Sequence, residues 1–402
     1  MIPVPEAIQI VLDHTPQLEA DSVSLLDALG RVLAQDIVAD CDLPPFDRAQ
    51  MDGYAVRASD TLKVPARLRV VGESAAGSGW HQEMYSGEAV RIMTGAPVPA
   101  GADAVQKVEV TRELNDGAIV DILEAVEQGR SIVRRAEEIK AGETVLSAGE
   151  LISAEMIATL ASFGYASLQV GRRPRVAVMA TGSELVDVDK KPGQDQIRDS
   201  NNYTIAAYAT LAGAAVERLP LAGDNRQQLK RQMAEAASSS DMLITSGGVS
   251  MGVYDFTKAA LRDLGAEIFF ERVALRPGKP TVFGKLGETL IFGLPGNPVS
   301  VSVTFHLFVR AALRAMQGAK ECAKPETAIL LRKVKGTIER ASYLPARLLT
   351  SDKSCVIAEP LKWGGSSDFV AFARATALII VPQGVQAIDE GSQVKIIRLP
   401  GN

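Results

Sequence analysis

Hydrophobic residues recur at helical spacing in two stretches near the amino terminus, residues 5–14 and 24–34. Apolar side chains three and four positions apart share one face of a helix, so this pattern predicts two helices. A proline-rich break follows at residues 43–46. Residues 54–123 then show short apolar runs separated by glycine, proline and asparagine turns, which predicts a compact β domain.

The middle of the chain alternates strand patterns with helical patterns. This regime begins near residue 173, after a helix expected over residues 154–162 and one further strand. Strands that alternate with helices of this length predict a mostly parallel sheet with helices on both faces. From about residue 326 the pattern predicts a small terminal β domain. The expected strands of the middle region are 175–179, 215–220, 242–245, 268–274 and 290–292, and its expected helices are 201–211, 225–237, 255–264 and 299–316.

Length and composition then favour a multidomain α/β protein over a small module. The chain has 402 residues, of which 47% are hydrophobic and 23% charged, as in ordinary globular proteins. The amino-terminal segment lacks the basic and long apolar parts of a signal peptide, and no stretch approaches a membrane span. We therefore expect a cytoplasmic protein without a membrane partner. The formal charge of -5, with no basic run interleaved with aromatic residues, argues against nucleic acid as a partner.

Cysteine and histidine usage narrows the chemistry further. The three cysteines are far apart and odd in number, which argues against a disulfide framework and against a cysteine-based zinc site. The three histidines lie in three different contexts, so a histidine metal site and a Ser-His-Asp triad are both disfavoured. Any chemistry must therefore depend on carboxylates, hydroxyls, lysines and arginines.

Four strand-to-helix loops of the middle region are polar and glycine-rich, and ligands bind at this end of parallel strands. The first loop, residues 180–185, combines the backbone freedom of Gly182 with the carboxylate of Glu184, although an ordinary helix start explains it as well. The second loop places Gly247 and Gly248 directly after a strand. Paired glycines there let backbone N–H groups approach a phosphate or a pterin.

The remaining features of these loops are cations, prolines and one further acid. Asp255 follows the paired glycines and is equally compatible with a helix cap. Residues 275–280 hold Arg276 and Lys279 on a proline-limited turn, which suits a tetrahedral dianion, while a surface turn with solvated charges is the alternative. Residues 293–300 form a Pro-Gly turn before a helix that begins near Pro298, and an ordinary helix entrance has the same composition.

Together with two motifs nearer the amino terminus, these loops resemble one family over essentially the whole chain. That family is the molybdopterin molybdenumtransferases, the bacterial relatives of the carboxyl-terminal region of gephyrin. Seven motifs in the same order make coincidence implausible. They are PPFDRAQMDGYAV, RIMTGAPVP, ATGSEL, IRDSN, SGGVSMGVYDFTK, RPGKP and GLPGNPVS.

The resemblance implies four domains in each subunit of an elongated homodimer. We place an N-terminal two-part domain at residues 1–43 and 138–171 and an inserted β domain at residues 44–137. The α/β domain would cover residues 172–321, and a small β barrel residues 322–402. The central domain is expected to resemble an adenylyltransferase.

The resemblance also implies an activity: insertion of molybdate into adenylylated molybdopterin, with Mg²⁺ required and AMP released. The expected partners are a second copy, an upstream molybdopterin adenylyltransferase and recipient molybdoenzymes. The implied catalytic residues are Asp52, Thr94, Glu184, Asp255 and Lys279, and the implied metal ligands are Glu184, Asp255 and Glu138. The implied substrate-binding positions are Asp199, Asn201, Asp224, Gly247, Gly248, Ser250, Arg276, Pro295, Asn297, Pro298 and Ser300.

Some positions depart from the family pattern, and two other functions stay open. Glu138 stands where the family has aspartate, and Arg276 stands where it has lysine. A molybdopterin adenylyltransferase is one alternative, although its signature continues the paired glycines with Thr-Gly, whereas this chain has Val249 and Ser250. A non-enzymatic scaffold, as gephyrin provides, is the other. Tungstate also remains an alternative to molybdate, since the two oxyanions share charge and shape.

Overall fold

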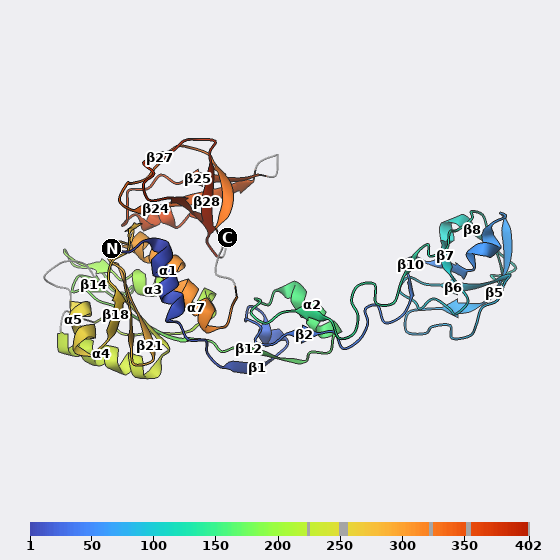
Figure 1. Ribbon diagram of the computed structural model, residues 1–402, viewed down its shortest axis with the longest axis horizontal. Helices are drawn as coiled ribbons and strands as arrows, with labels where there is room; N and C mark the ends of the chain where they lie inside the picture. Colours follow the sequence, from blue (N-terminus) through green and yellow to red (C-terminus); the bar gives the residue numbers. More distant parts are fainter. Residues whose placement is uncertain (223–225, 249–255, 321–324, 351–354, 401–402) are drawn as a thin grey trace. The chain divides into compact units, whose positions relative to one another are not determined.

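The computed structural model describes residues 1–222, 226–248, 256–320, 325–350 and 355–400 (Figure 1). The chain separates into two compact units. The first comprises Met1–Gln35, Ala148–Ile157 and Ser167–Asn402, and the second comprises Asp36–Ser147 and Ala158–Ala166. This division does not fix the four domain boundaries expected from the sequence, which stay predictions.

The first unit is built on a six-stranded sheet with the strand order β16-β13-β17-β21-β20-β18. The first four strands are parallel, and β20 and β18 continue the sheet antiparallel. This confirms the mostly parallel sheet predicted from the sequence, although β20 was not predicted. The strands are β13 (Arg175–Ala180), β16 (Ala215–Arg218), β17 (Met242–Ser246), β18 (Glu267–Phe270), β20 (Val282–Leu286) and β21 (Thr289–Leu294).

Helices cover both faces of this sheet because successive strand side chains point to opposite sides. In β13, Val176 and Val178 belong to the core under α1 (Val4–Asp13) and α3 (Asn201–Leu211). Ala177 and Met179 belong to the opposite core, under α4 (Arg226–Ser239) and α5 (Phe256–Asp263). Figure 1 shows α4 and α5 side by side next to the sheet. A doubly covered sheet leaves its strand ends as the accessible positions for a ligand.

One long helix on the α1 side changes its winding midway. It runs as α6 (Pro298–Thr304), a π-helical segment (η4, Phe305–Val309) and α7 (Arg310–Met316). From the sequence we expected no stretch that approaches a membrane span. That expectation is wrong for Pro298–Met316, which is long and apolar enough to cross a membrane by length and composition alone. In the structure 83% of this stretch is buried inside the protein, so its apolar character is explained by core packing.

The second helix predicted near the amino terminus, over residues 24–34, is wrong. Residues Ala20–Ser24 form β1, which pairs antiparallel with β12 (Ser167–Gly171), and only Leu26–Ala28 make a short 3₁₀ turn (η1). Leu26 and Leu29 remain 77% and 53% exposed. Backbone pairing with residues distant in sequence therefore overrode the local apolar spacing. The predicted helix over residues 154–162 is present as α2 (Ala154–Ser162).

The carboxyl-terminal region is a small β barrel, as predicted, and it is closed by five strands. Its strands run β24-β25-β22-β28-β26, and β26 pairs with β24 to close the circle. A short strand, β19 (Leu275–Arg276), leaves the α/β region and pairs parallel with β24. The barrel strands are β22 (Glu326–Leu330), β24 (Ala341–Thr350), β25 (Val356–Pro360), β26 (Ala377–Val381) and β28 (Gln393–Arg398), and the region also contains β23 (Val334–Lys335), β27 (Ala387–Ile388) and α8 (Phe369–Phe372).

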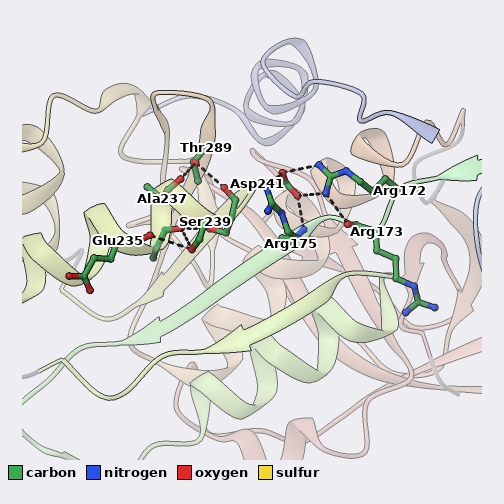
Figure 2. A network of polar contacts seen from close by, with 10 residues as sticks. Arg172, Arg173, Arg175, Glu235, Ala237, Ser239, Asp241 and Thr289 are labelled. Atoms are coloured by element: carbon green, nitrogen blue, oxygen red, sulfur yellow. Dashed lines mark hydrogen bonds and ion pairs between the residues drawn. The ribbon is translucent and has the colours of Figure 1, made fainter. Parts of the chain in front are cut away.

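Paired charges hold the amino-terminal edge of the α/β sheet (Figure 2). Asp241 accepts two hydrogen bonds from the Arg172 guanidinium, both 2.9 Å, and one of 2.7 Å from the Arg175 backbone N–H. Burial alone raises the pKa of the Asp241 carboxyl, but these bonds and the positive charges bring that pKa below its usual range. Thr289 Oγ1 donates to the Ala237 carbonyl at 2.6 Å in the same region. The acidic group at this edge is therefore paired with cations of the same chain.

The second unit is a β structure around a six-stranded sheet of order β7-β4-β6-β5-β9-β8, which confirms the β domain predicted here. Buried residues lie on both faces, with Tyr54 and Val56 in one core and Ala55 and Val90 in another. Its strands are β4 (Gly53–Val56), β5 (Ala66–Ser74), β6 (Glu88–Ile92), β7 (Ala104–Lys107), β8 (Thr111–Leu114) and β9 (Ile119–Ile122), with the smaller pairs β2 (Ile37–Val38) with β11 (Thr144–Leu146) and β3 (Arg48–Ala49) with β10 (Ile132–Val133).

Candidate active site

Three of the four predicted loops meet where β13, β17 and β21 end. Thr181 follows β13, and its backbone N–H donates to the carbonyl of Ser246, the last residue of β17, at 2.9 Å. Gly247 then donates to the carbonyl of Leu294, the last residue of β21, at 3.2 Å. The carboxyl ends of parallel strands lie at one edge of a sheet. Loops that are far apart in the sequence therefore come together there.

Asn201, at the start of α3, connects the second and fourth loops. Its Nδ2 donates to Ser246 Oγ at 2.8 Å and to the Gly296 carbonyl at 2.7 Å. Its Oδ1 is buried and accepts no hydrogen bond from the described residues. A buried acceptor without a donor is costly unless a ligand or water supplies one. Ser246 was missed by the sequence analysis, because a hydroxyl at a strand end gives no distinctive pattern.

The paired glycines have a structural reason that the sequence did not reveal. Both have positive φ, 89° at Gly247 and 63° at Gly248. A Cβ at Gly247 would collide with the Thr181 carbonyl, and one at Gly248 would collide with the Thr257 hydroxyl. Both glycines are thus required for the loop to pack on itself, whether or not a ligand approaches their N–H groups.

Glu184 is exposed, and the alternative of a helix start after it is wrong. The residues that follow it form β14 (Leu185–Val186), which pairs parallel with β15 (Ile197–Arg198). Its carboxylate lies over Gly182, close enough that a Cβ there would collide with it. It makes no hydrogen bond or ion pair with the part of the chain that the structure describes. The carboxylate is therefore available to a cation.

Asp199 is buried behind this loop and bonded to backbone. Its Oδ1 accepts a hydrogen bond of 3.0 Å from the backbone N–H of Asn202, in the first turn of α3. Asp199 is only 3% exposed. Burial raises the pKa of the Asp199 carboxyl, although the hydrogen bonds from Asn202 and Asn201 act in the opposite direction. The structure thus gives Asp199 the contacts of a helix cap.

The third and fourth loops line a cavity of about 970 Å³ shared with the barrel. It is lined by four of the predicted substrate-binding positions, Arg276, Pro295, Asn297 and Ser300, together with Lys279, a predicted catalytic residue. The barrel side was not predicted, because those residues follow the loops by 30 or more positions and no motif marks them. The barrel contributes Lys333, Val334, Lys335, Arg340, Leu344, Pro345, Pro360, Leu361, Trp363, Gly364, Gly365 and Ser366.

The charge on this cavity has one sign. Arginines and lysines line it, and no aspartate or glutamate is among the described residues of its wall. Lys333 is paired with Asp389 at 2.7 Å. The other four cations, Arg276, Lys279, Lys335 and Arg340, make no ion pair with the described residues. Converging positive charges create a field that attracts anions, so the cavity is suited to an anionic ligand.

The backbone of the cationic turn is fixed while its charged side chains stay exposed. The Lys279 carbonyl accepts N–H groups from Val273 and Thr281 at 3.0 and 3.1 Å. Thr281 Oγ1 donates to the Gly278 carbonyl at 2.7 Å. On the facing loop, Pro298 begins α6 as predicted. A rigid turn with free cations is preorganised for an oxyanion.

Asp52 and Thr94, predicted as a pair in the second unit, are in direct contact. Asp52 Oδ1 accepts both the hydroxyl and the backbone N–H of Thr94, each at 2.7 Å. These two hydrogen bonds, with a smaller effect of the Arg91 charge, hold the pKa of the Asp52 carboxyl below its usual range. Asp52 is therefore an exposed carboxylate of fixed orientation.

Of the three predicted metal ligands, the structure describes two, Glu138 and Glu184. Glu138 is exposed and paired with Arg48 at 2.9 Å in the second unit, whereas Glu184 lies in the first. No group of three or more His, Cys, Asp or Glu with metal-binding geometry exists among the residues that the structure describes. Asp224, Ser250 and Asp255 lie outside the described residues.

Three family models match successive parts of the chain. Residues 2–164 match a model described as MoeA N-terminal region (domain I and II). Residues 177–315 match a probable molybdopterin binding domain, and residues 327–399 match a MoeA C-terminal region (domain IV). The middle match covers the α/β sheet and all four loops.

Full-length relatives give the same result. The chain is 35% identical over 400 residues to a molybdopterin molybdenumtransferase of Haemophilus influenzae, covering 98% of both chains. A Bacillus subtilis protein of the same name is 36% identical over 98% of this chain and 94% of its own. Among solved structures, a molybdopterin biosynthesis moeA protein from Pyrococcus horikoshii is 28% identical, with a TM-score of 0.85, over 99% of this chain and 100% of its own.

Proposed function

The chain belongs to the molybdopterin molybdenumtransferase family, and on that premise we propose that it inserts molybdate into adenylylated molybdopterin and releases AMP. The observation that supports this most directly is the cavity of about 970 Å³ with unpaired cations, next to the glycine loop. Both substrates are anions, and the reaction moves negative charge within one site. A cationic wall beside the glycine loop suits both requirements.

The pterin side of the substrate is assigned to the second loop and Asn201. The buried Asn201 Oδ1 lacks a donor among the described residues, and pterins carry N–H groups that can donate to it. Gly247 and Gly248 present backbone next to it, and Ser250 follows in the sequence. These groups would orient the pterin rather than react with it.

The anionic side is assigned to the cationic turn. Lys279 and Arg276 would bind molybdate and neutralise the charge that develops when the phosphoanhydride breaks and the dithiolene captures the metal. Lys335 and Arg340 of the barrel face the same cavity and extend this role to residues that the sequence did not indicate. No side chain in this scheme acts as a covalent nucleophile.

Mg²⁺ fits the residues present, as a weakly held ion rather than a caged one. Mg²⁺ keeps several waters and commonly takes one or two carboxylates plus substrate phosphates. The exposed Glu184 carboxylate, with Asp255 on the following loop, would supply those ligands, whereas Glu138 is already paired with Arg48. A bound Mg²⁺ would supply charge neutralisation at the phosphoanhydride.

We further propose that the protein works as a cytoplasmic homodimer. Asp52 and Thr94 of one subunit would complete the site formed by the α/β loops of the other, since an isologous interface uses the same patches twice. The upstream adenylyltransferase and recipient molybdoenzymes are the proposed functional partners. The exposed, oriented Asp52 carboxylate is a group suited to such a shared site.

The test is AMP release from adenylylated molybdopterin with and without molybdate. We expect release that depends on molybdate and increases with Mg²⁺. A scaffold would release no AMP, and an adenylyltransferase would produce the substrate from molybdopterin and ATP instead. The family matches on both sides of the α/β domain argue against a molybdopterin adenylyltransferase. The scaffold is not favoured, because relatives matched over nearly their whole length are molybdopterin molybdenumtransferases.

A further inference from the structure

The cavity between the cationic turn and the barrel is larger than an oxyanion requires. Its volume is about 970 Å³, at the upper end of the range for pockets that enclose small organic molecules. Molybdate is a single tetrahedral oxyanion, and Arg276 and Lys279 are already assigned to it. A further part of the substrate can therefore occupy the same cavity.

The barrel contributes an aromatic side chain to this cavity. Trp363 is the one aromatic residue among the described residues that line it, and Leu344, Pro345, Pro360 and Leu361 add aliphatic surface to the same wall. Trp363 is partly buried and packs against both the α/β core and the barrel core. Part of its indole is thus held by the two cores, while the remainder lines the cavity.

Hydrogen bonds fix the segment that carries Trp363 on both sides. Before it, the Leu361 backbone N–H donates to the Pro345 carbonyl at 2.9 Å. After it, the Ser366 carbonyl accepts the backbone N–H of Val299 at 3.0 Å. The indole therefore extends from a fixed backbone, and an aromatic platform that is ordered in advance loses little freedom when a ligand binds.

The fourth loop lies between the second loop and this aromatic wall. On one side, the Gly296 carbonyl accepts an N–H of Asn201 at 2.7 Å. On the other side, Asn297 Nδ2 donates to Ser366 Oγ of the barrel region at 2.8 Å. A substrate whose pterin lies at the second loop would therefore place its opposite end against the barrel wall. In adenylylated molybdopterin, that opposite end is the adenosine.

We propose that Trp363 binds the adenine of the substrate by stacking, an assignment that rests on the proposed function. Stacking requires a flat ring face on each partner, and both the indole and adenine have one. The cations that line the same cavity favour the phosphate attached to the adenosine. Trp363 would contribute binding and orientation and take no part in bond breaking.

AMP is the probe, because it carries the adenine and its binding is measured without turnover. The chain has two tryptophans, and Trp80 lies in the second unit. In Trp80→Phe, we expect AMP to quench the remaining tryptophan fluorescence saturably, with the Kd that calorimetry gives for the wild type. Trp363→Ala should weaken AMP binding about tenfold or more, whereas Trp363→Phe keeps a flat ring and should stay within about threefold of the wild type.

Two controls separate stacking from general effects. Phe369→Ala removes an exposed aromatic side chain of α8 that is not among the described lining residues, so AMP affinity should not change. Ribose 5-phosphate lacks the base, so it should bind more weakly than AMP and equally to the wild type and Trp363→Ala. AMP binding of equal strength in Trp363→Ala and the wild type would overturn the proposal. AMP that binds Trp80→Phe by calorimetry without quenching its fluorescence would overturn it as well, even if Trp363→Ala does not fold.

Failure of this proposal is distinguishable from failure of the proposed function. Molybdate-dependent AMP release by a protein whose AMP affinity does not depend on Trp363 would remove the stacking site alone. AMP binding that depends on Trp363, without AMP release from adenylylated molybdopterin, would leave the stacking site in place and contradict the proposed function.

Discussion

The two edges of the α/β sheet use charge in opposite ways. At the amino edge, Asp241 is paired with Arg172 and Arg175 of the same chain. At the carboxyl edge, Arg276 and Lys279 make no ion pair with the described residues. Both edges carry arginines, so composition cannot tell them apart. The difference teaches that a charge whose partner lies within the fold stabilises it, whereas a charge without one is available for a ligand.

The prediction with the largest expected effect tests whether one chain alone supplies every active-site residue at the carboxyl edge of the sheet. Asp52→Ala and Asp255→Ala should each be inactive. A mixture with exchanged subunits should recover about a quarter of wild-type AMP release, because about half the dimers are mixed and each has one intact site. Heterodimer content is measured with two different affinity tags. Verified heterodimers without activity would contradict a shared site.

A second prediction compares a free cation with a paired one in the same cavity. Lys279→Ala should raise the molybdate concentration for half-maximal AMP release by about 10- to 150-fold, as expected for about 1.5 to 3 kcal/mol. The matched control is Lys333→Ala, since Lys333 lines the same cavity but is paired with Asp389. Lys333→Ala should change the molybdate concentration for half-maximal AMP release by about threefold or less.

Equal effects of the two lysine substitutions would remove the distinction between paired and unpaired cations. If excess molybdate fails to restore activity in Lys279→Ala, and its apparent affinity for molybdate is unaltered, then Lys279 has another role. Both variants should unfold at the same urea concentration as the wild type, because neither side chain is buried.

A third prediction concerns the amino edge. Asp241→Asn should lower the free energy of unfolding by about 1 to 3 kcal/mol, because the partly buried Arg172 and the exposed Arg175 lose their counter-charge. Urea unfolding measures this. The molybdate dependence of AMP release by the folded variant should stay unchanged. A change in molybdate dependence without loss of stability would mean that the two edges are not functionally separate.

The smallest expected effect is the pH dependence of the difference in free energy of unfolding between the wild type and Asp241→Asn. The pKa of Asp241 is lowered by folding, so its contribution is fully present above the unfolded pKa of about 3.9 and is lost as pH falls through the folded value. The difference between wild type and Asp241→Asn should therefore narrow below about pH 4. A difference that stays constant from pH 6 to about pH 3 would contradict the assigned pKa direction.

The sequence predicted the loops better than the surfaces that face them. Loops after parallel strands follow a general rule, so the convergence of Thr181, Gly247 and Leu294 was foreseeable. Lys335 and Arg340 were not, because the barrel reaches the cationic turn through the pairing of β19 with β24, which joins residues far apart in the sequence. The failed helix at residues 24–34 has a similar cause, since its backbone partners lie more than 100 residues away.

Some predicted site residues also have a structural requirement that the sequence did not indicate. Gly248 was predicted to admit a ligand, but a side chain there would first collide with Thr257. Substitution of Gly248 by valine is therefore expected to disturb the loop itself and is a poor test of pterin binding. Asp199 is similar, because its contacts are those of a helix cap. A local pattern indicates that a residue matters without indicating which contact requires it.

The pairing of β19 with β24 has a consequence for protein engineering. The strand that carries Arg276 belongs by hydrogen bonding to the barrel, although it belongs by chain order to the α/β region. A shortened protein that ends after α7 would leave β19 without its partner, and unpaired strand edges promote aggregation. Exchange of the barrel for that of a relative would likewise have to preserve the register of Leu275 with Ala341. The two regions are therefore separable in sequence but not as independent modules.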